Sequence, residues 1–235
     1  VPESEASPSS SMAGLAAATE LARYQFETPL RTTLLSTLSR AVDTVLQRTV
    51  VLERFSETAS VDTGDAASAN AAAVIRSDAA MDRIRTLART ASPFVQRVLS
   101  LDRSQRVAIF EAPAGRAMRE VADVFSAAER IRMLKRLARG IAAIADLGQS
   151  HGAITADQVL LDDHGTPTIL IAGTGDAVVA TTGAASAAAD VAAIVAVVTA
   201  MPGGTIAGWD ALSAANDAQD LYRLADLLET RLLAG

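Results

Sequence analysis

The order of two hydrophobic periodicities along the chain constrains its fold most strongly. Between residues 23 and 55, β-branched and aromatic residues form short runs with polar breaks, which is typical of antiparallel strands. Helical spacing follows at 73–91, then two strand-like runs at 94–99 and 106–110, and then mostly helical sequence. Sheet, helix, sheet and then helices is the order of an α+β chain in two lobes.

The second half of the chain carries clear boundary signals. Ser126 with Glu129 three residues later is a capping-box pattern that predicts a helix to about Leu147, and Gly148 suits the position after it. A short helix, a hairpin and two further helices are expected over 117–125, 158–171, 190–200 and 221–233.

These boundaries divide the chain into three parts. Residues 1–22 are predicted to be a Ser/Pro/Glu-rich disordered leader that ends in a short Ala-rich helix. Residues 23–111 form the predicted N-terminal lobe, with a turn at 42–44 and a polar loop at 56–72. Residues 112–235 form a shortened, helical C-terminal lobe.

Composition excludes several classes of function. The 235 residues contain no cysteine, which rules out disulfides, thiolate zinc sites and cysteine nucleophiles, and the two histidines are too few for a His-built metal site. A net charge of −6 argues against general nucleic-acid binding. The longest apolar stretch, 191–201, is too short to span a bilayer, and no signal peptide is visible. We therefore expect a cytoplasmic domain. The cytosolic domain of a membrane protein is one form that this expectation covers.

One composition detail restricts the chemistry further. Of the 21 basic residues only Lys135 is a lysine, and it falls on the charged face of the helix predicted after Ser126. Most Schiff-base chemistry and most lysine phosphate clamps would have to use that one residue.

Residues 151–173, HGAITADQVLLDDHGTPTILIAG, resemble the catalytic loop and following hairpin of bacterial Ser/Thr (PknB-like) protein kinases. Residues 23–55 are similar to the first three strands of that family, and Asp190-Val191 resembles the start of a helix at the core of its C-lobe. The resemblance covers about 23–200. It implies a two-lobed protein kinase-like fold, with a small antiparallel β N-lobe and a reduced helical C-lobe.

The family's phosphate- and metal-handling positions hold unsuited residues in this chain. The glycine-rich loop positions fall on Arg31, Thr33 and Ser36, and no glycine occurs from 15 to 63. The phosphate-binding lysine position falls on Glu53, a reversal of charge. The remaining positions, for the helix carboxylate, the catalytic aspartate and lysine, and the metal-binding asparagine and aspartate, fall on Arg83, Ala153, Thr155, Gln158 and Ile171.

The resemblance therefore implies a catalytically inactive pseudokinase, a regulatory or scaffolding domain without ATP, magnesium or another cofactor. Such domains include the cytosolic domain of the MurJ (MviN) lipid II flippases, which recruits an FHA-type phosphothreonine reader. The implied partner is a protein, and the candidates include an active Ser/Thr kinase and such a reader. Neither nucleic-acid binding nor membrane insertion by this segment is expected. The alternative is an atypical nucleotide-using transferase or a nucleotide sensor, with Arg31, Arg54, Arg83, Asp157 or Asp163 as replacement ligands.

Four further expectations concern small groups of residues. Glu53 and Arg83 are a candidate for the family's Lys–Glu pair with its polarity swapped, against the alternative of two unrelated surface charges. His151 and Asp190 are expected to be structural, with Asp190 hydrogen-bonding the backbone of the His151 loop. Asp157, Asp162 and Asp163 suit a turn better than a metal cluster. Thr181 and Thr182 are candidate phosphoacceptors.

Overall fold

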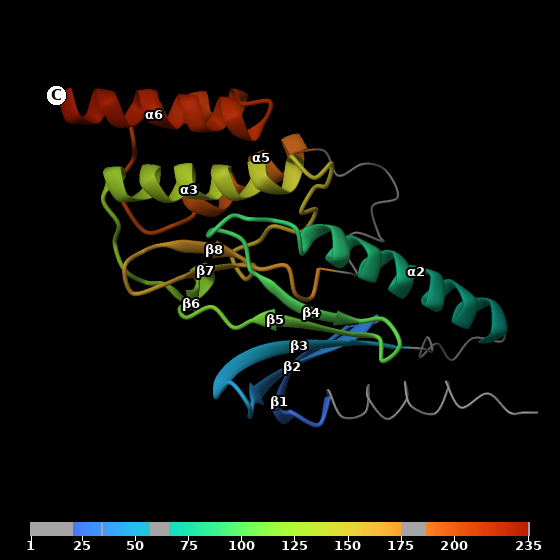
Figure 1. Ribbon diagram of the computed structural model, residues 1–235. Coiled ribbons are helices and arrows are strands. Elements are labelled where there is room, and N and C mark those ends of the chain that lie inside the picture. Colours follow the sequence, from blue (N-terminus) through green and yellow to red (C-terminus); the bar gives the residue numbers. More distant parts are fainter. Residues whose placement is uncertain (1–20, 34, 57–65, 175–186, 235) are drawn as a thin grey trace, which may run out of the picture.

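A computed structural model describes residues 21–33, 35–56, 66–174 and 187–234. The N-terminal lobe is built on an antiparallel sheet in the order β1-β2-β3-β5-β4, which stacks below a helical C-terminal lobe in Figure 1. The strands are β1 (Tyr24–Thr32), β2 (Ser36–Asp43), β3 (Arg48–Phe55), β4 (Val98–Asp102) and β5 (Val107–Glu111). β3 pairs directly with β5, although a helix and β4 lie between these two strands in the sequence.

Alternation along β3 gives the sheet two buried faces. Val50 and Leu52 belong to a small core on one face, whereas Phe55 belongs to the main core that includes α2 (Ala66–Leu87) and the C-terminal lobe. Because successive side chains of a strand point to opposite faces, Glu53 faces the same way as Phe55, toward the other lobe, and Arg54 faces away from it.

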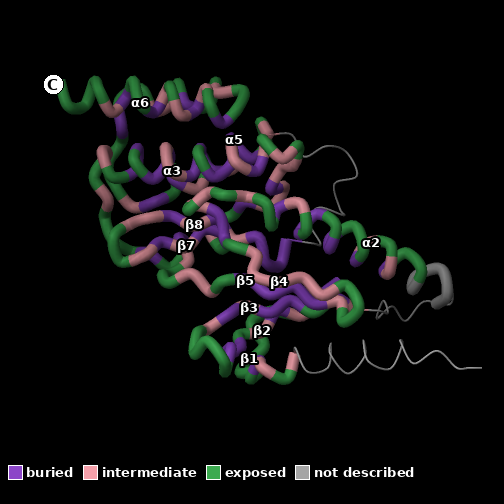
Figure 2. Tube along the Cα trace, in the orientation of Figure 1, coloured by how far each residue is buried: buried purple, intermediate pink, exposed green. Residues whose placement is uncertain are grey.

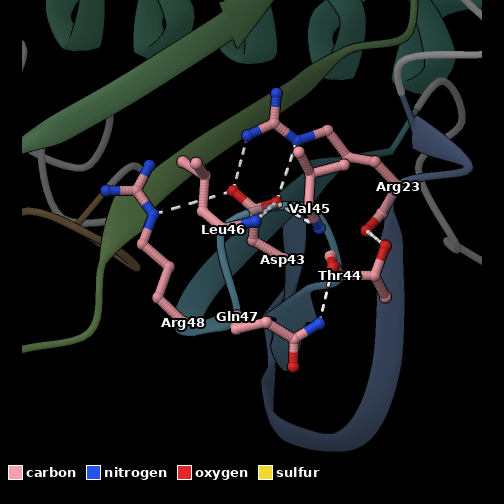
Figure 3. Close-up of polar contacts among 7 residues, drawn as sticks. All are labelled: Arg23, Asp43, Thr44, Val45, Leu46, Gln47 and Arg48. Carbon is pink, nitrogen blue, oxygen red and sulfur yellow. Dashed lines mark hydrogen bonds and ion pairs between the residues drawn. The ribbon is translucent and has the colours of Figure 1, made fainter.

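The turn between β2 and β3 is held by one carboxylate. Asp43 accepts hydrogen bonds from the backbone N–H groups of Val45 and Leu46, both at 3.2 Å, and from the Arg23 guanidinium (Figure 3). The turn predicted at 42–44 therefore lies later, because Asp43 still belongs to β2 and its side chain organises the four residues that follow.

Further predicted boundaries in the N-terminal lobe are wrong, and the helix expected to reach residue 91 ends at Leu87. The segment 66–72, expected to be loop, is the first part of α2, because alanine has the highest helix propensity even where apolar spacing is missing. The strand expected from residue 94 begins at Val98. Before it, Val95 forms only an isolated bridge to Ile169 of the C-terminal lobe.

The C-terminal lobe is organised around α3 (Ala127–Ala145), which packs on α5 (Ala187–Thr199) and α6 (Ala218–Ala234). The capping box is confirmed: Ser126 Oγ accepts from Glu129 N, and Ser126 N donates to Glu129 Oε2 at 2.8 Å. The short helix expected at 117–125 is wrong, because Ala117 belongs to a strand and only a single 3-10 turn follows it. That region holds β6 (Arg116–Ala117) and a 3-10 turn, η1 (Met118–Glu120), and β6 pairs with β7 (Val159–Leu161) and through it with β8 (Pro167–Ile169).

The single lysine joins two helices of this lobe. Lys135 Nζ on α3 lies 2.6 Å from an oxygen of Asp226 and 2.8 Å from an oxygen of Glu229, both on α6, and these carboxylates raise the pKa of Lys135. Figure 2 shows that α6 becomes exposed toward its C-terminal end. Within the described residues, no helix has the length and apolar character needed to cross a membrane.

Candidate functional site

The side chain of Glu53 lies between the two lobes and is 0% exposed. Its Oε1 accepts a hydrogen bond from Ser36 Oγ at 2.7 Å, and its Oε2 accepts one from the backbone N–H of Gly173 at 3.0 Å. β3 holds Glu53 in register with Leu38 on one side and Ala108 on the other. A carboxylate thus occupies the position that the kinase resemblance gives to a phosphate-binding lysine, and donors of both lobes engage it.

The backbone after β8 is held by buried side chains of the N-terminal lobe. Gln96 Oε1 accepts the N–H groups of Ile171 and Ala172 at 2.9 and 3.0 Å, and Glu53 accepts that of Gly173. All three residues that correspond to the metal-binding D-F-G motif are therefore fixed through their N–H groups. Ile171, at the aspartate position, is 1% exposed and belongs to the main core.

Arg83 connects α2 to the C-terminal lobe. Its guanidinium donates to the carbonyl oxygens of Ser150 and His151, at 3.0 and 2.8 Å, and to Thr174 Oγ1 at 2.9 Å. Thr174 in turn donates to the carbonyl of Ile171 at 2.7 Å. Burial lowers the pKa of Arg83 to about 10, against the opposing effect of the Asp190 and Glu53 carboxylates, so the side chain stays charged at neutral pH.

The swapped Glu53–Arg83 pair expected from the sequence does not form as a direct contact. The Arg83 guanidinium donates its hydrogen bonds to the Ser150 and His151 carbonyls and to Thr174. No ion pair within 4 Å joins it to Glu53 among the described residues. The two charges instead act on consecutive residues, Glu53 on Gly173 and Arg83 on Thr174. Together they fix the segment after β8 against both β3 and α2.

Asp190, at the start of α5, organises the loop that contains His151. Its two oxygens accept the backbone N–H groups of His151 and Gly152 at 2.5 and 2.8 Å. The His151 ring contacts the Leu170 carbonyl through Nε2 at 2.7 Å. Burial lowers the pKa of His151 to about 4 and raises that of Asp190, so His151 is neutral at pH 7.

The hairpin tip between β1 and β2 uses its own backbone donors. Thr33 N donates to the Ser36 carbonyl at 2.8 Å, and Thr33 Oγ1 accepts from the N–H groups of Leu35 and Ser36 at 3.3 and 3.0 Å. A phosphate-binding loop needs N–H groups directed at the ligand. At the three described positions of this tip, the N–H groups are already bonded within the hairpin.

An open cleft of about 880 Å³ remains between the lobes. Its lining residues come from β1, β2, η1, the His151 loop and the segment after β8, namely Leu30, Arg31, Leu38, Arg119, Ala153, Thr155, Asp157, Gln158, Leu170, Ala172 and Gly173. Gln158 is only 8% exposed, yet its Oε1 has no hydrogen-bond partner among the described residues. Such a buried, unsatisfied acceptor costs about 1–3 kcal/mol.

Of the remaining candidates, Asp157 lines this cleft, Arg54 and Asp162 lie apart from it, and Thr181 and Thr182 lie outside the described residues. Arg54 stacks over Phe26 on the opposite face of the sheet, at 5.5 Å from the ring centroid, and Asp162 accepts backbone N–H groups of the β7–β8 turn. Asp157 pairs with Arg119 at 2.9 Å, and no group of three metal-ligating side chains occurs in the described ranges. Thr181 and Thr182 fall within 175–186, outside the described residues.

Three residues of the site were not found from the sequence. Gln96, Thr174 and Arg119 acquire their roles only through contacts with residues far away in the chain. The sequence signal that existed was weak: Gln96 interrupts an apolar run before β4, where a buried amide needs partners. Nothing in the sequence marked Arg119, which sits in a region predicted to be a helix.

Comparisons with known proteins support the fold and no closer relationship. No family model matches the chain, and no curated protein matches it. Among solved structures, "PpkA-294 apo form", a bacterial Ser/Thr kinase domain, is similar with a TM-score of 0.64. The match is 13% identical in sequence and covers 88% of this chain and 96% of that chain. The chain therefore has a kinase-like, two-lobed α+β fold, as expected from the sequence.

Proposed function

We propose that this domain is a pseudokinase: it transfers no phosphate and acts as a regulatory or scaffolding domain that binds a protein partner. The observation that carries the proposal is the fully buried Glu53, with both oxygens engaged by Ser36 and Gly173. A negative charge there repels a triphosphate, where the kinase mechanism needs a cation to neutralise it.

Other contacts support the same function. The N–H groups at the hairpin tip are used internally, and Ala153 and Ile171 supply no carboxylate to activate a hydroxyl group or to bind magnesium. Charge stabilisation and positioning supply nearly all of the rate enhancement in phosphoryl transfer, so losing these groups together removes most of it. Gln96, Glu53 and Arg83 tie the lobes together, which suits a fixed surface for a partner.

A nucleotide sensor or atypical transferase is the second candidate, and one observation favours it. The cleft of about 880 Å³ is large enough for a nucleotide, and Arg31 and Arg119 line it. Against it stand Asp157, which pairs with Arg119, and Glu53 directly behind Gly173. Both carboxylates oppose a phosphate chain in this cleft.

The test is a phosphotransfer assay with ATP labelled in its γ-phosphate, with magnesium and with manganese. We expect no label on the domain itself or on generic acceptor proteins, at any concentration of the domain. A control preparation carrying Ala153→Asp and Gln158→Asn restores two family residues in the cleft and is also expected to be inactive, because Glu53 remains. Label incorporation by the unmodified protein that scales with its concentration would overturn the proposal.

A further inference from the structure

The outer face of the N-terminal sheet, which is turned away from the C-terminal lobe, is closed to solvent. Its core residues come from β1, β2, β3 and β5, namely Tyr24, Ala41, Val50, Leu52, Val107 and Ile109. Ala41 and Val50 are 0% exposed, and Leu52 and Val107 are 1% exposed. Side chains in the middle of a sheet face are buried this completely only when a second layer of structure lies on them.

The described residues provide little of that second layer. Among them, the partly buried hydrophobic side chains that pack against this outer core are those of Leu21 and Leu99. Leu99 belongs to β4 at the edge of the same sheet, so it extends the face without covering it. Since α2 and the C-terminal lobe pack on the opposite face, the cover has to come from outside the described ranges.

Residues 1–20 lead directly onto this face. Leu21 is helical, lies shortly before β1 and packs on the outer core. Leu15 and Ala18 precede it at steps of three residues, a spacing that puts all three on one side of a helix. A helix over the nine residues 12–20 is about 14 Å long, enough to cross three strands spaced at about 4.8 Å.

The other two long segments outside the described ranges attach elsewhere. Residues 57–65 join β3 to α2, and residues 175–186 join the segment after β8 to α5. The elements at these junctions pack into the main core, on the side of the sheet that faces the C-terminal lobe. Residues 57–65, ETASVDTGD, also contain no large apolar residue besides Val61. Residues 1–20 are therefore the segment that suits the outer face.

From the buried face and this continuity of the chain, we propose that residues 12–20 pack as a helix across the outer face of the N-terminal sheet, with Leu15 and Ala18 on the outer core. The segment then forms a layer of this lobe and occupies a surface that would otherwise be open to apolar partners. The proposal concerns the face opposite the cleft, so it goes beyond the pseudokinase assignment and does not depend on it.

The test uses single introduced thiols, because the chain contains no cysteine of its own. Ala41→Cys reports on the outer face and Ala108→Cys on the inner face, and both alanines are 0% exposed. Each variant is made in the full chain, and its reaction with the thiol reagent DTNB is timed. Both thiols should react slowly, because a buried thiol is inert.

Leu15→Asp then removes the central apolar contact of the proposed helix. In this background Ala41→Cys should react about tenfold faster or more, because burying the new carboxylate is unfavourable and the segment is released. The control Ser9→Asp adds the same charge outside 12–20 and should change the rate by less than about twofold. Ala108→Cys should stay slow in both backgrounds, which reports that the rest of the domain remains folded.

A spin label decides the question even if Leu15→Asp unfolds the whole domain. It is attached to Ala16→Cys in the otherwise unmodified full chain, on the side of the proposed helix away from Ala18. The label should broaden the amide NMR signals of β2 and β3. It should leave unchanged those of α6, which lies at the far end of the molecule in Figure 1. Reducing the label should restore the broadened signals.

Three results would overturn the proposal. The first is fast reaction of Ala41→Cys in the otherwise unmodified chain, or a rate that Leu15→Asp raises no more than Ser9→Asp does. The second is unchanged β2 and β3 signals beside the label at Ala16→Cys. The third is a reaction of Ala41→Cys that slows as the protein concentration rises, because a second copy then covers the face. None of these results bears on phosphotransfer, so the two proposals fail separately.

Discussion

A carboxylate that is completely removed from water depends on the donors around it. Among the described residues, Glu53 accepts from one donor in the hairpin of its own sheet and from one in the backbone of the other lobe. It therefore serves as a junction between the lobes, and the structure needs its negative charge for stability. Under the proposed function, the same charge, directly behind Gly173, opposes phosphate in the cleft.

Replacing Glu53 with the family's lysine is predicted to destabilise the protein. Glu53→Lys places a buried cation near Arg83 and against the Gly173 N–H donor, which costs about 3–5 kcal/mol. Urea denaturation measures the loss. The control is Glu27→Lys, the same change at a half-exposed residue whose ion pair with Arg40 is 3.4 Å long, with an expected cost below about 1 kcal/mol. Equal stability of Glu53→Lys and the wild type would contradict this role of Glu53.

Buried His151 predicts a pH dependence of stability. Burial lowers the pKa of His151 from 6.5 to about 4, so the unfolded chain binds a proton in this range and the folded chain does not. Above about pH 6.5, His151 is neutral in both states and leaves the free energy of unfolding unchanged. As pH drops to about 4, protonation of the unfolded chain lowers the free energy of unfolding by about 3 kcal/mol.

The measurement is urea denaturation from pH 7 to pH 4 for the wild type and for His151→Gln. Asp190 has a raised pKa and acts in the opposite direction at the acidic end, but it is present in both proteins. The difference between them therefore isolates the histidine. Parallel pH profiles for the two proteins would show that folding leaves the pKa of His151 unchanged and would contradict the prediction.

At the scale of elements, Arg83 fixes α2 on the loop of the other lobe. Arg83→Met removes three hydrogen bonds from a charged donor and leaves two carbonyls unsatisfied, so we expect a loss of about 3 kcal/mol. Amide hydrogen exchange along α2 should accelerate at the same time. Arg85→Met, on the exposed face of the same helix, is the control and should change stability by less than about 0.5 kcal/mol. Similar exchange in both variants would refute the anchoring role.

The β2–β3 turn gives a second element-scale prediction, in the acid range. The hydrogen bonds from Arg23 hold the pKa of Asp43 at about 2, below its usual 3.8, with help from the turn N–H groups (Figure 3). A depressed acid pKa stabilises the fold above about pH 4, and this contribution is lost as pH falls toward 2. Unfolding midpoints of the wild type should thus fall more steeply over this range than those of Asp43→Asn. Identical slopes would contradict the assignment.

The elements that could be predicted from the sequence are those with strong local signals. The capping box at Ser126 placed the start of α3 correctly, and β-branched runs located β1 to β3. The beginning of α2 could not be predicted, since residues 66–72 lack apolar spacing. The contacts of Gln96 with Ile171 and Ala172 join residues about 75 positions apart, which no local pattern encodes.

For the whole molecule, the resemblance in the sequence and the similarity in structure concern the same arrangement of lobes. At positions where the kinase resemblance expects reactive residues, this chain holds residues that make contacts of their own. Glu53 and Arg83 each bond to the C-terminal lobe, and Ser36 donates to Glu53 within the N-terminal sheet.

The central claim, that the cleft accepts no nucleotide, is tested most directly by a thermal-shift measurement with millimolar ATP, with and without magnesium or manganese. A ligand present at one hundred times its Kd would add about 2.7 kcal/mol to stability, or roughly 5–10 °C in Tm for a domain of this size. The structure predicts no change in Tm with any combination. A rise in Tm that grows with ATP concentration would contradict the account.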